Sequence, residues 1–122
     1  MTDTIIKYAS VTVTDYGHAL IFFVEGLGWE IMEDKPRDEG RWLIVAPRGA
    51  ETGLVIKQPD DPGATDTVGR FTGFAFKTDD LDVVCHRLTS LGFEFPSPPG
   101  EMPWGERGAV VADRDGNTYA LS

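Results

Sequence analysis

The side chains in this sequence that are able to do chemistry are few, and several of them fall in helical patterns. The histidines His18 and His86 and the single cysteine, Cys85, each lie in a segment with helical spacing of apolar residues. Histidines on such a segment are most often exposed surface residues, although a role in pH sensing or at an interface stays open. One cysteine excludes an internal disulfide and a cysteine-cluster zinc site, and we expect Cys85 to be a small buried residue.

An acidic cluster precedes the second helical pattern. Asp79, Asp80 and Asp82 stand close together there, and such carboxylates can chelate a cation. An aspartate at the start of a helix also accepts hydrogen bonds from free backbone N–H groups, and its charge suits the positive end of the helix dipole. We therefore favour helix capping by Asp79 or Asp80, and we assign Asp15 as the cap of the first helix.

The composition limits the classes of protein to which the chain can belong. Its 122 residues, 41% hydrophobic and 25% charged, predict one globular domain over residues 1–122. A net charge of −9 disfavours nucleic acid and anionic membrane surfaces as partners. No apolar run is long enough for a membrane span, and the first residues do not form a secretory signal. These features predict a cytoplasmic protein.

An internal repeat organises the chain. Leu27-Gly28-Trp29-Glu30 recurs as Leu91-Gly92-Phe93-Glu94, so the two glycines stand 64 positions apart. In each half a helix is expected to end at that glycine. Alternating or apolar segments predict strands, and they lie at 5–14, 29–33, 41–46, 53–57, 71–77, 93–95, 108–112 and 118–122. The sequence therefore predicts an α+β fold of two βαβββ modules, residues 1–57 and 70–122, joined by a linker at 58–69.

The first helix is apolar around nearly its whole circumference. It carries Ile21 and Val24 in addition to the stripe that should face a sheet. A helix of this kind is usually covered on two sides, which predicts a homodimer.

The order of these motifs resembles that of a known family, the glyoxalase/bleomycin-resistance/extradiol-dioxygenase superfamily, also called the vicinal oxygen chelate proteins. The resemblance covers essentially the whole chain. It rests on the series Asp15, Ala19, Phe22-Phe23, Leu27-Gly28-Trp29-Glu30, Phe74-Ala75-Phe76, Asp79-Asp80-Leu81-Asp82, Leu88, Gly92-Phe93-Glu94-Phe95, Pro103-Trp104-Gly105 and Asp113-Arg114-Asp115-Gly116-Asn117. Arg114 departs from the usual proline of the last turn. The resemblance implies a cupped mixed sheet, with helices on the convex side and a ligand cavity on the concave side.

The resemblance also implies where metal-dependent members place their four ligands. Those strand positions fall on Tyr8, Lys57, Gly73 (or Thr72 in a register shifted by one) and Ala120. Glycine and alanine offer no side-chain donor, and a lysine ammonium has no lone pair. We therefore expect no metal and no cofactor, which is the pattern of a non-metal branch.

The remaining candidates for a binding site are aromatic, polar and basic. In the register that the resemblance implies, Tyr8, Ser10 and Thr12 share one face of the first strand and should face the cavity. Trp42 fits a place in the core and a place in the cavity equally well, and Trp104 lies in a loop at the rim. The complete expected ligand-binding set is Tyr8, Ser10, Thr12, Trp42, Lys57, Trp104 and Arg107.

Similarity to the bleomycin-resistance branch implies a dimer that sequesters a small molecule, as in antibiotic resistance. Aromatic faces and a charge of −9 favour a planar aromatic ligand that is neutral or cationic, while an unpaired Lys57 would favour an anion. Two other functions stay open. One is a glyoxalase- or dioxygenase-like lyase, isomerase or oxygenase, including a metal-free isomerase that uses Tyr8, Lys57 or Glu101 as acid and base. The other is a dimerisation module with an unused cavity.

Overall fold

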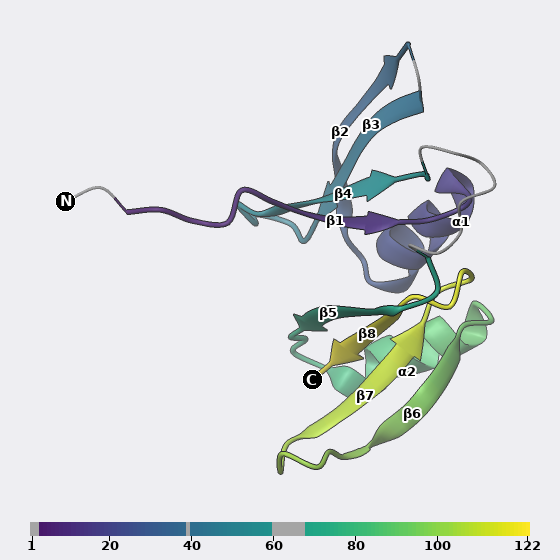
Figure 1. Cartoon of the computed structure of the whole chain (residues 1–122). Helices are drawn as coiled ribbons and strands as arrows, with labels where there is room; N and C mark the ends of the chain where they lie inside the picture. The colour runs from purple at the N-terminus through teal and green to yellow at the C-terminus, as the bar shows by residue number, and fades with distance from the viewer. Residues whose placement is uncertain (1–2, 39, 60–67) are drawn as a thin grey trace. The chain divides into compact units, whose positions relative to one another are not determined.

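Two four-stranded mixed sheets with the same strand order make up the chain (Figure 1). The structure is a computed structural model that describes residues 3–38, 40–59 and 68–122. Contacts divide the chain into a first unit, Met1–Thr65, and a second unit, Asp66–Ser122, and each is described by itself. None of the helices in the described ranges has the length and apolar character needed to cross a membrane.

The first unit contains one broken helix and a sheet in the order β1-β4-β3-β2. β1 runs parallel to β4, while β3 is antiparallel to both β2 and β4. The elements are β1 (Tyr8–Thr12), α1 (Tyr16–Leu20), η1 (Ile21–Gly26), β2 (Glu30–Arg37), β3 (Gly40–Ala46) and β4 (Gly53–Lys57).

The second unit repeats this topology in the order β5-β8-β7-β6, with β5 parallel to β8. The βαβββ repeat predicted from the sequence is therefore confirmed. The two units divide between residues 65 and 66, inside the predicted linker at 58–69, of which 60–67 lie outside the described residues. The elements are β5 (Phe71–Phe76), α2 (Leu81–Ser90), β6 (Glu94–Glu101), β7 (Arg107–Ala112) and β8 (Thr118–Leu121).

The first helix has the predicted extent, but it begins as an α-helix and continues as a π-helix. The Asp15 carboxylate accepts a hydrogen bond from the backbone N–H of His18 at 2.9 Å, as a helix cap does. After α1 the chain widens into the π-helix η1, where the N–H of Leu27 donates to the carbonyl of Phe22 at 3.0 Å, five residues back. Gly28 then ends the helix with a φ of 77°, which suits a residue without a side chain.

The second helix is capped by Asp80 rather than by Asp79. Its carboxylate accepts a hydrogen bond from the N–H of Val83 at 3.2 Å. His86 on α2 is exposed, as is His18 on α1, while Cys85 is buried. The placement of all three expected from the sequence is confirmed.

Two strands are much longer than the sequence predicted. β2 covers Glu30–Arg37 rather than 29–33, and β6 covers Glu94–Glu101 rather than 93–95. Each of these strands contains a proline, Pro36 or Pro96, which cannot donate to a ladder and is therefore a local signal against a strand. Both strands lie at the edge of their sheet, where a missing N–H costs no pairing. By contrast β1 is shorter than predicted, Tyr8–Thr12 rather than 5–14.

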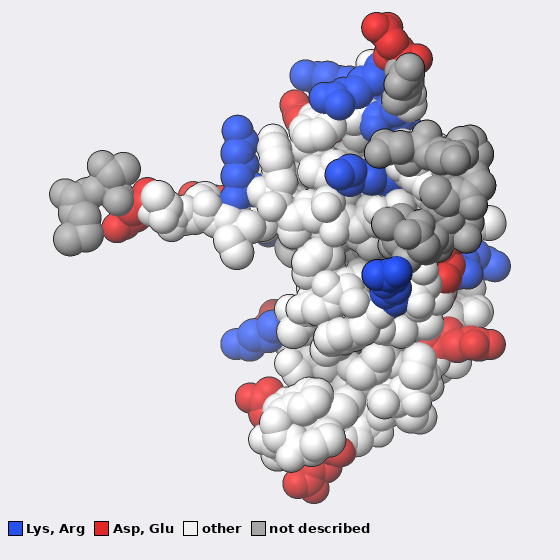
Figure 2. All heavy atoms as spheres, in the orientation of Figure 1, with Lys and Arg blue, Asp and Glu red and all other residues white. Residues whose placement is uncertain are grey.

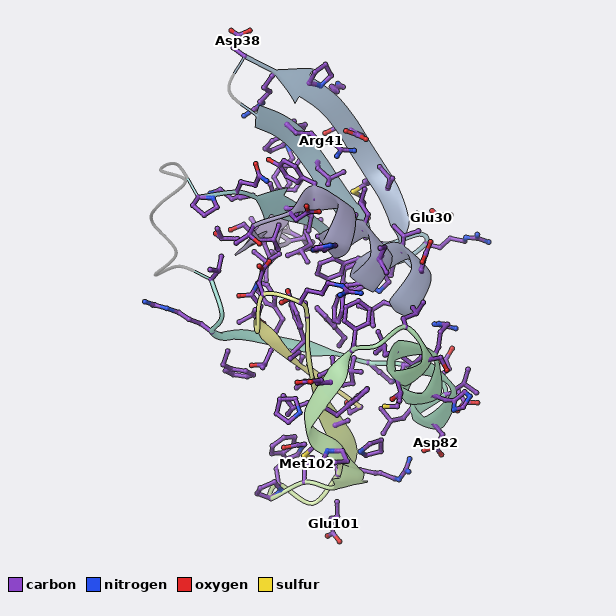
Figure 3. The ribbon with its side chains drawn as sticks, turned by 90° about the vertical axis from the view of Figure 1, so that its right-hand side faces the viewer. Glu30, Asp38, Arg41, Asp82, Glu101 and Met102 are labelled. Carbon is purple, nitrogen blue, oxygen red and sulfur yellow. The ribbon has the colours of Figure 1, made fainter. Side chains whose placement is uncertain are left out.

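One face of each sheet packs toward its helix (Figures 1 and 3). In the first unit, Leu43 and Val45 of β3 are fully buried, and Arg41, which shares their alternation, has its guanidinium 5.4 Å from the ring of Tyr16 in α1. In the second unit, Arg107 of β7 bonds to Asp82 of α2 at 2.7 Å. Odd-numbered residues of β3 and β7 therefore face the helices, and even-numbered residues face the other way.

Candidate functional site

The face of the first sheet turned away from α1 combines aromatic, hydroxyl and charged side chains. Its central row runs across four paired strands from Ser10 through Val55 and Ile44 to Glu33. Tyr8 precedes Ser10 by two residues, and Trp42 precedes Ile44 by two residues. Because β1 and β3 run in opposite directions, Tyr8 and Trp42 lie on opposite sides of this row. We call this surface the aromatic face; it comprises Tyr8, Ser10, Thr12, Glu33, Lys35, Arg37, Trp42, Ile44, Val55 and Lys57.

The rings of Tyr8 and Trp42 meet edge to face, with their centroids 5.7 Å apart and their planes at 82°. Gly53 makes room for Ile44 on the same face, since a Cβ there would lie 2.5 Å from Ile44 Cγ2, while Tyr8 Cδ1 would be at an ordinary contact distance of 3.5 Å. Tyr8 keeps 40% of its surface exposed, whereas Ile44 is buried. The open question about Trp42 is thus answered: it is half-buried on the aromatic face, not in the core beneath the helix.

Glu33 holds the indole of Trp42 in place. Trp42 Nε1–H donates to Glu33 Oε2 at 2.7 Å, and Lys35 Nζ lies 3.4 Å from Glu33 Oε1. The hydrogen bond from Trp42 is the main cause that lowers the pKa of Glu33, and Lys35 lowers it further. A carboxylate acceptor fixes the tilt of the ring without covering its faces.

Two cations lie over these rings. The guanidinium carbon of Arg37 is 4.5 Å from the Trp42 ring centroid, and Lys7 Nζ is 5.3 Å from that of Tyr8. The expected binding set lacks Arg37 because the strand predicted from the sequence ends at residue 33, before Arg37. The alternation of Glu33, Lys35 and Arg37 was the signal that could have extended the strand past Pro36.

The polar residues expected in the site also lie on the first unit. Ser10 pairs with Val55, and Thr12 pairs with Lys57, in the parallel register of β1 and β4. Lys57 is exposed, and within the described parts of the chain it forms no ion pair. The structure therefore brings Tyr8, Ser10, Thr12, Trp42 and Lys57 onto one surface.

The other two expected site residues belong to the second unit. Trp104 lies between β6 and β7 with 60% of its surface exposed, and its contact with a ligand stays a prediction. Arg107 lies on the helix-facing side of β7 and is engaged by Asp82. The ligand-binding role of Arg107 stays a prediction. Glu101, considered as an acid or base, is exposed at the end of β6 beside Met102 (Figure 3).

On the corresponding face of the second sheet the central row has small side chains; it runs from Ala75 through Ala120 and Val110 to Ser97. Phe71, at the start of β5, is exposed on the same face. Gly73, a position where metal-dependent relatives are expected to carry a ligand, has a φ of 79° and open space around its Cα. Across residues 3–38, 40–59 and 68–122, no three His, Cys, Asp or Glu side chains are grouped so that they could hold a metal ion.

A buried carboxylate organises the last turn of the second unit. Asp113 accepts hydrogen bonds from the hydroxyl of Tyr119 at 2.9 Å, from Asn117 Nδ2 at 3.1 Å, and from the backbone N–H groups of Asp115 and Asn117, each at 3.0 Å. Burial raises the pKa of Asp113, and these hydrogen bonds oppose the rise. Because every donor belongs to the turn and to β8, this network is structural.

Comparison with known proteins agrees with the fold. The family model of the Glyoxalase/Bleomycin resistance protein/Dioxygenase superfamily matches residues 5–121. The structure of TnmS3, an antibiotic binding protein from Streptomyces sp. CB03234, is 39% identical and covers 100% of this chain and 97% of its own, with a TM-score of 0.80. A superfamily member from Sphaerobacter thermophilus is 32% identical, covers 98% of this chain and 96% of its own, and has a TM-score of 0.82. The uncharacterized protein YetH of Bacillus subtilis is 33% identical over 117 residues, 95% of each chain.

Proposed function

The chain belongs to the glyoxalase/bleomycin resistance protein/dioxygenase superfamily, and on this premise we propose that it is a binding protein that sequesters a planar aromatic small molecule on the aromatic face. The observation that carries the proposal is the Tyr8–Trp42 pair, two rings in contact on a sheet and turned away from the helix. A similar protein, TnmS3, is described as an antibiotic binding protein, which supports ligand binding as the activity.

The arrangement suits binding because the rings are held before a ligand arrives. The indole of Trp42 is fixed by Glu33, and its ring already meets the ring of Tyr8 edge to face. A preorganised ring loses little conformational entropy when it stacks on a ligand. Each aromatic contact of this kind contributes about 0.5–1.5 kcal/mol beyond the area it buries. Ser10, Thr12 and Lys57 supply polar groups beside the rings and complete the proposed site.

We further propose that the protein acts as a homodimer. Ile5 and Ile6 are 62% and 69% exposed, on a segment that extends away from the first sheet (Figure 1). Apolar side chains on such a segment are suited to an interface, and a stable one buries at least about 1,200 Å² in total. By contrast Ile21 and Val24, from which the dimer was predicted, are already half-buried within the chain.

Sedimentation of the wild type and of the double variant Ile5→Asp/Ile6→Asp tests the proposed dimer, with a dimer expected for the wild type and a monomer for the variant. A monomeric wild type at tens of micromolar would contradict it.

Calorimetric titration with acridine at pH 8, where this ring system is neutral, tests the proposed site. Trp42→Ala should weaken binding by about tenfold, the effect of losing one stacking contact of roughly 1.4 kcal/mol. The matched control is Tyr16→Ala. This change also removes an aromatic ring that has a guanidinium over it, that of Arg41, but the ring lies on the helix side of the same sheet. The control should bind acridine as the wild type does. Absence of binding by the wild type, or equal loss in both variants, would reject the proposal.

A further inference from the structure

We infer that the aromatic face selects planar aromatic ligands that carry a negatively charged group such as a carboxylate, in spite of the acidic character of the whole chain. This inference rests on the proposed function, because it assumes that ligands bind at Tyr8 and Trp42. It reverses the preference for neutral or cationic ligands that the net charge of −9 suggested.

Positive side chains surround the two rings. Lys7 lies over Tyr8, Arg37 lies over Trp42, Lys35 stands opposite Trp42 in the strand register, and Lys57 ends the neighbouring strand. Glu33 stands among them, so these five described residues together carry an excess of three positive charges. Lys7, Arg37 and Lys57 form no ion pair with any residue that the structure describes.

Two other carboxylates of β2 are already paired with arginines. Asp34 alternates with Glu33 onto the helix side and receives two hydrogen bonds from Arg41, at 2.7 and 2.6 Å. Glu30, at the far end of β2, is paired with Arg48 at 2.9 Å. Figure 2 shows Lys and Arg side chains gathered over the strands of the first unit in this view. The acidic excess of the chain is therefore not located at the ring pair.

Local charge outweighs net charge at this range. The Debye length is about 8 Å at physiological ionic strength, so carboxylates farther away are screened while the cations beside the rings are not. A ligand at the Trp42 ring lies beside Arg37, whose guanidinium carbon is 4.5 Å from the centroid of that ring.

The geometry of Arg37 is suited to a carboxylate in particular. A guanidinium that stacks on an indole uses its flat face for the contact, and its N–H donors point outward in the plane of the group. Those donors can bind the two oxygens of a carboxylate side by side. Lys57 and Lys7, as flexible point charges, can approach the same anion from the neighbouring strand and from the chain segment before β1.

Three probes of nearly equal shape test this inference: acridine-9-carboxylate, acridine at pH 8, and 9-aminoacridine, which are anionic, neutral and cationic. We expect the wild-type protein to bind the anion about tenfold more tightly than the cation, and expect that preference to shrink in high salt. Arg37→Gln and Lys57→Gln should each remove most of the preference, measured as the ratio of the anion affinity to the cation affinity within the same variant. The control variant Arg48→Gln removes a cation that is already paired with Glu30, and it should keep the preference.

The outcomes distinguish a failure of the inferred charge preference from a failure of the proposed binding function. If acridine binds in a Trp42-dependent way but the cation equals or exceeds the anion, the inference about charge is wrong and the proposed binding function stands. If Arg37→Gln and Arg48→Gln behave alike, the charge preference does not come from the aromatic face, and the inference is again overturned. If none of the three probes binds, the proposed function fails and the inference fails with it.

Discussion

The two sheets share a strand order but present different faces. On the side away from the helix, the first sheet carries the Tyr8–Trp42 ring pair, and the second carries a row from Ala75 to Ser97 with no side chain larger than valine. The helix-facing sides are alike, because both are packed with apolar residues such as Val45 in the first unit and Val111 in the second. The repeat therefore preserves what folds each unit, while the opposite faces are free to differ in chemistry.

The difference also concerns how each unit is stabilised. In the second unit a buried carboxylate, Asp113, collects hydrogen bonds from Asn117 and Tyr119. Charged contacts of the first unit, such as Asp34 with Arg41, lie at the surface. A change to a polar group should thus have its largest effect on stability in the second unit and its largest effect on binding in the first.

The largest expected effect comes from Asp113→Ala. This change leaves the Tyr119 hydroxyl and the Asn117 amide, both buried, without their acceptor, which should lower the free energy of unfolding by about 2–4 kcal/mol. The matched change in the first unit, Asp34→Ala, should lower it by less than about 1 kcal/mol, because that pair is exposed to solvent. Urea denaturation measures both, and equal effects would contradict the contrast between the units.

A smaller difference is expected between two glycines that lie at close contacts. A Cβ on Gly108 would come within 2.7 Å of the backbone oxygen of Leu121, which cannot move without breaking the sheet. A Cβ on Gly53 would meet the side-chain ends of Ile44 and Met32, which can shift. Gly108→Ala should therefore cost about 1–3 kcal/mol of stability, more than Gly53→Ala. Gly53→Ala should instead shift Ile44, which lies on the aromatic face two residues from Trp42, and so weaken acridine binding, which Gly108→Ala should not do except through unfolding. The reverse order of stabilities in thermal melts would refute this account of the two faces.

The smallest expected effect is a change in the pKa of Glu33. In Trp42→Phe the indole donor is lost, so the pKa of Glu33 should rise back toward its ordinary value of 4.5. The stabilising effect of ionised Glu33 is present above that value and is lost as the pH falls through the lowered pKa of the folded state. Carboxyl carbon NMR across pH 2–6 follows this group directly, with Asp34 as an internal reference that should not move. An unchanged Glu33 titration would show that the indole does not act on this carboxylate.

Much of the fold could be predicted from the sequence, because its signals are local. Asp15 and Gly28 mark the two ends of the first helix through capping and a positive φ, and the apolar segment 53–57 matches β4. The predicted strand ends were wrong where the position of a strand in the sheet overrides a local sequence preference. Pro36 is compatible with a strand only because β2 lies at the edge of the sheet, and sheet order is not a local property.

The candidate site was less predictable for the same reason. The one-face alternation of Tyr8, Ser10 and Thr12 is local, and it was enough to place them together. The contact between Tyr8 and Trp42 depends on the register of three strands, which the sequence does not state. Arg37 lies beyond the strand predicted at 29–33, so the sequence pattern did not indicate the cations around the rings, and the net charge alone favoured a neutral or cationic ligand.

The most direct test of the central account follows the three tryptophan indole N–H signals by NMR while acridine-9-carboxylate is added to isotope-labelled protein. Trp42 should be identified by the loss of its signal in Trp42→Phe, and it should shift with saturation as the ligand stacks on its ring. Trp29, which packs against Phe23 with ring centroids 5.3 Å apart, should stay in place. Saturable binding in which the Trp42 signal does not move would contradict the assignment of the aromatic face as the binding site.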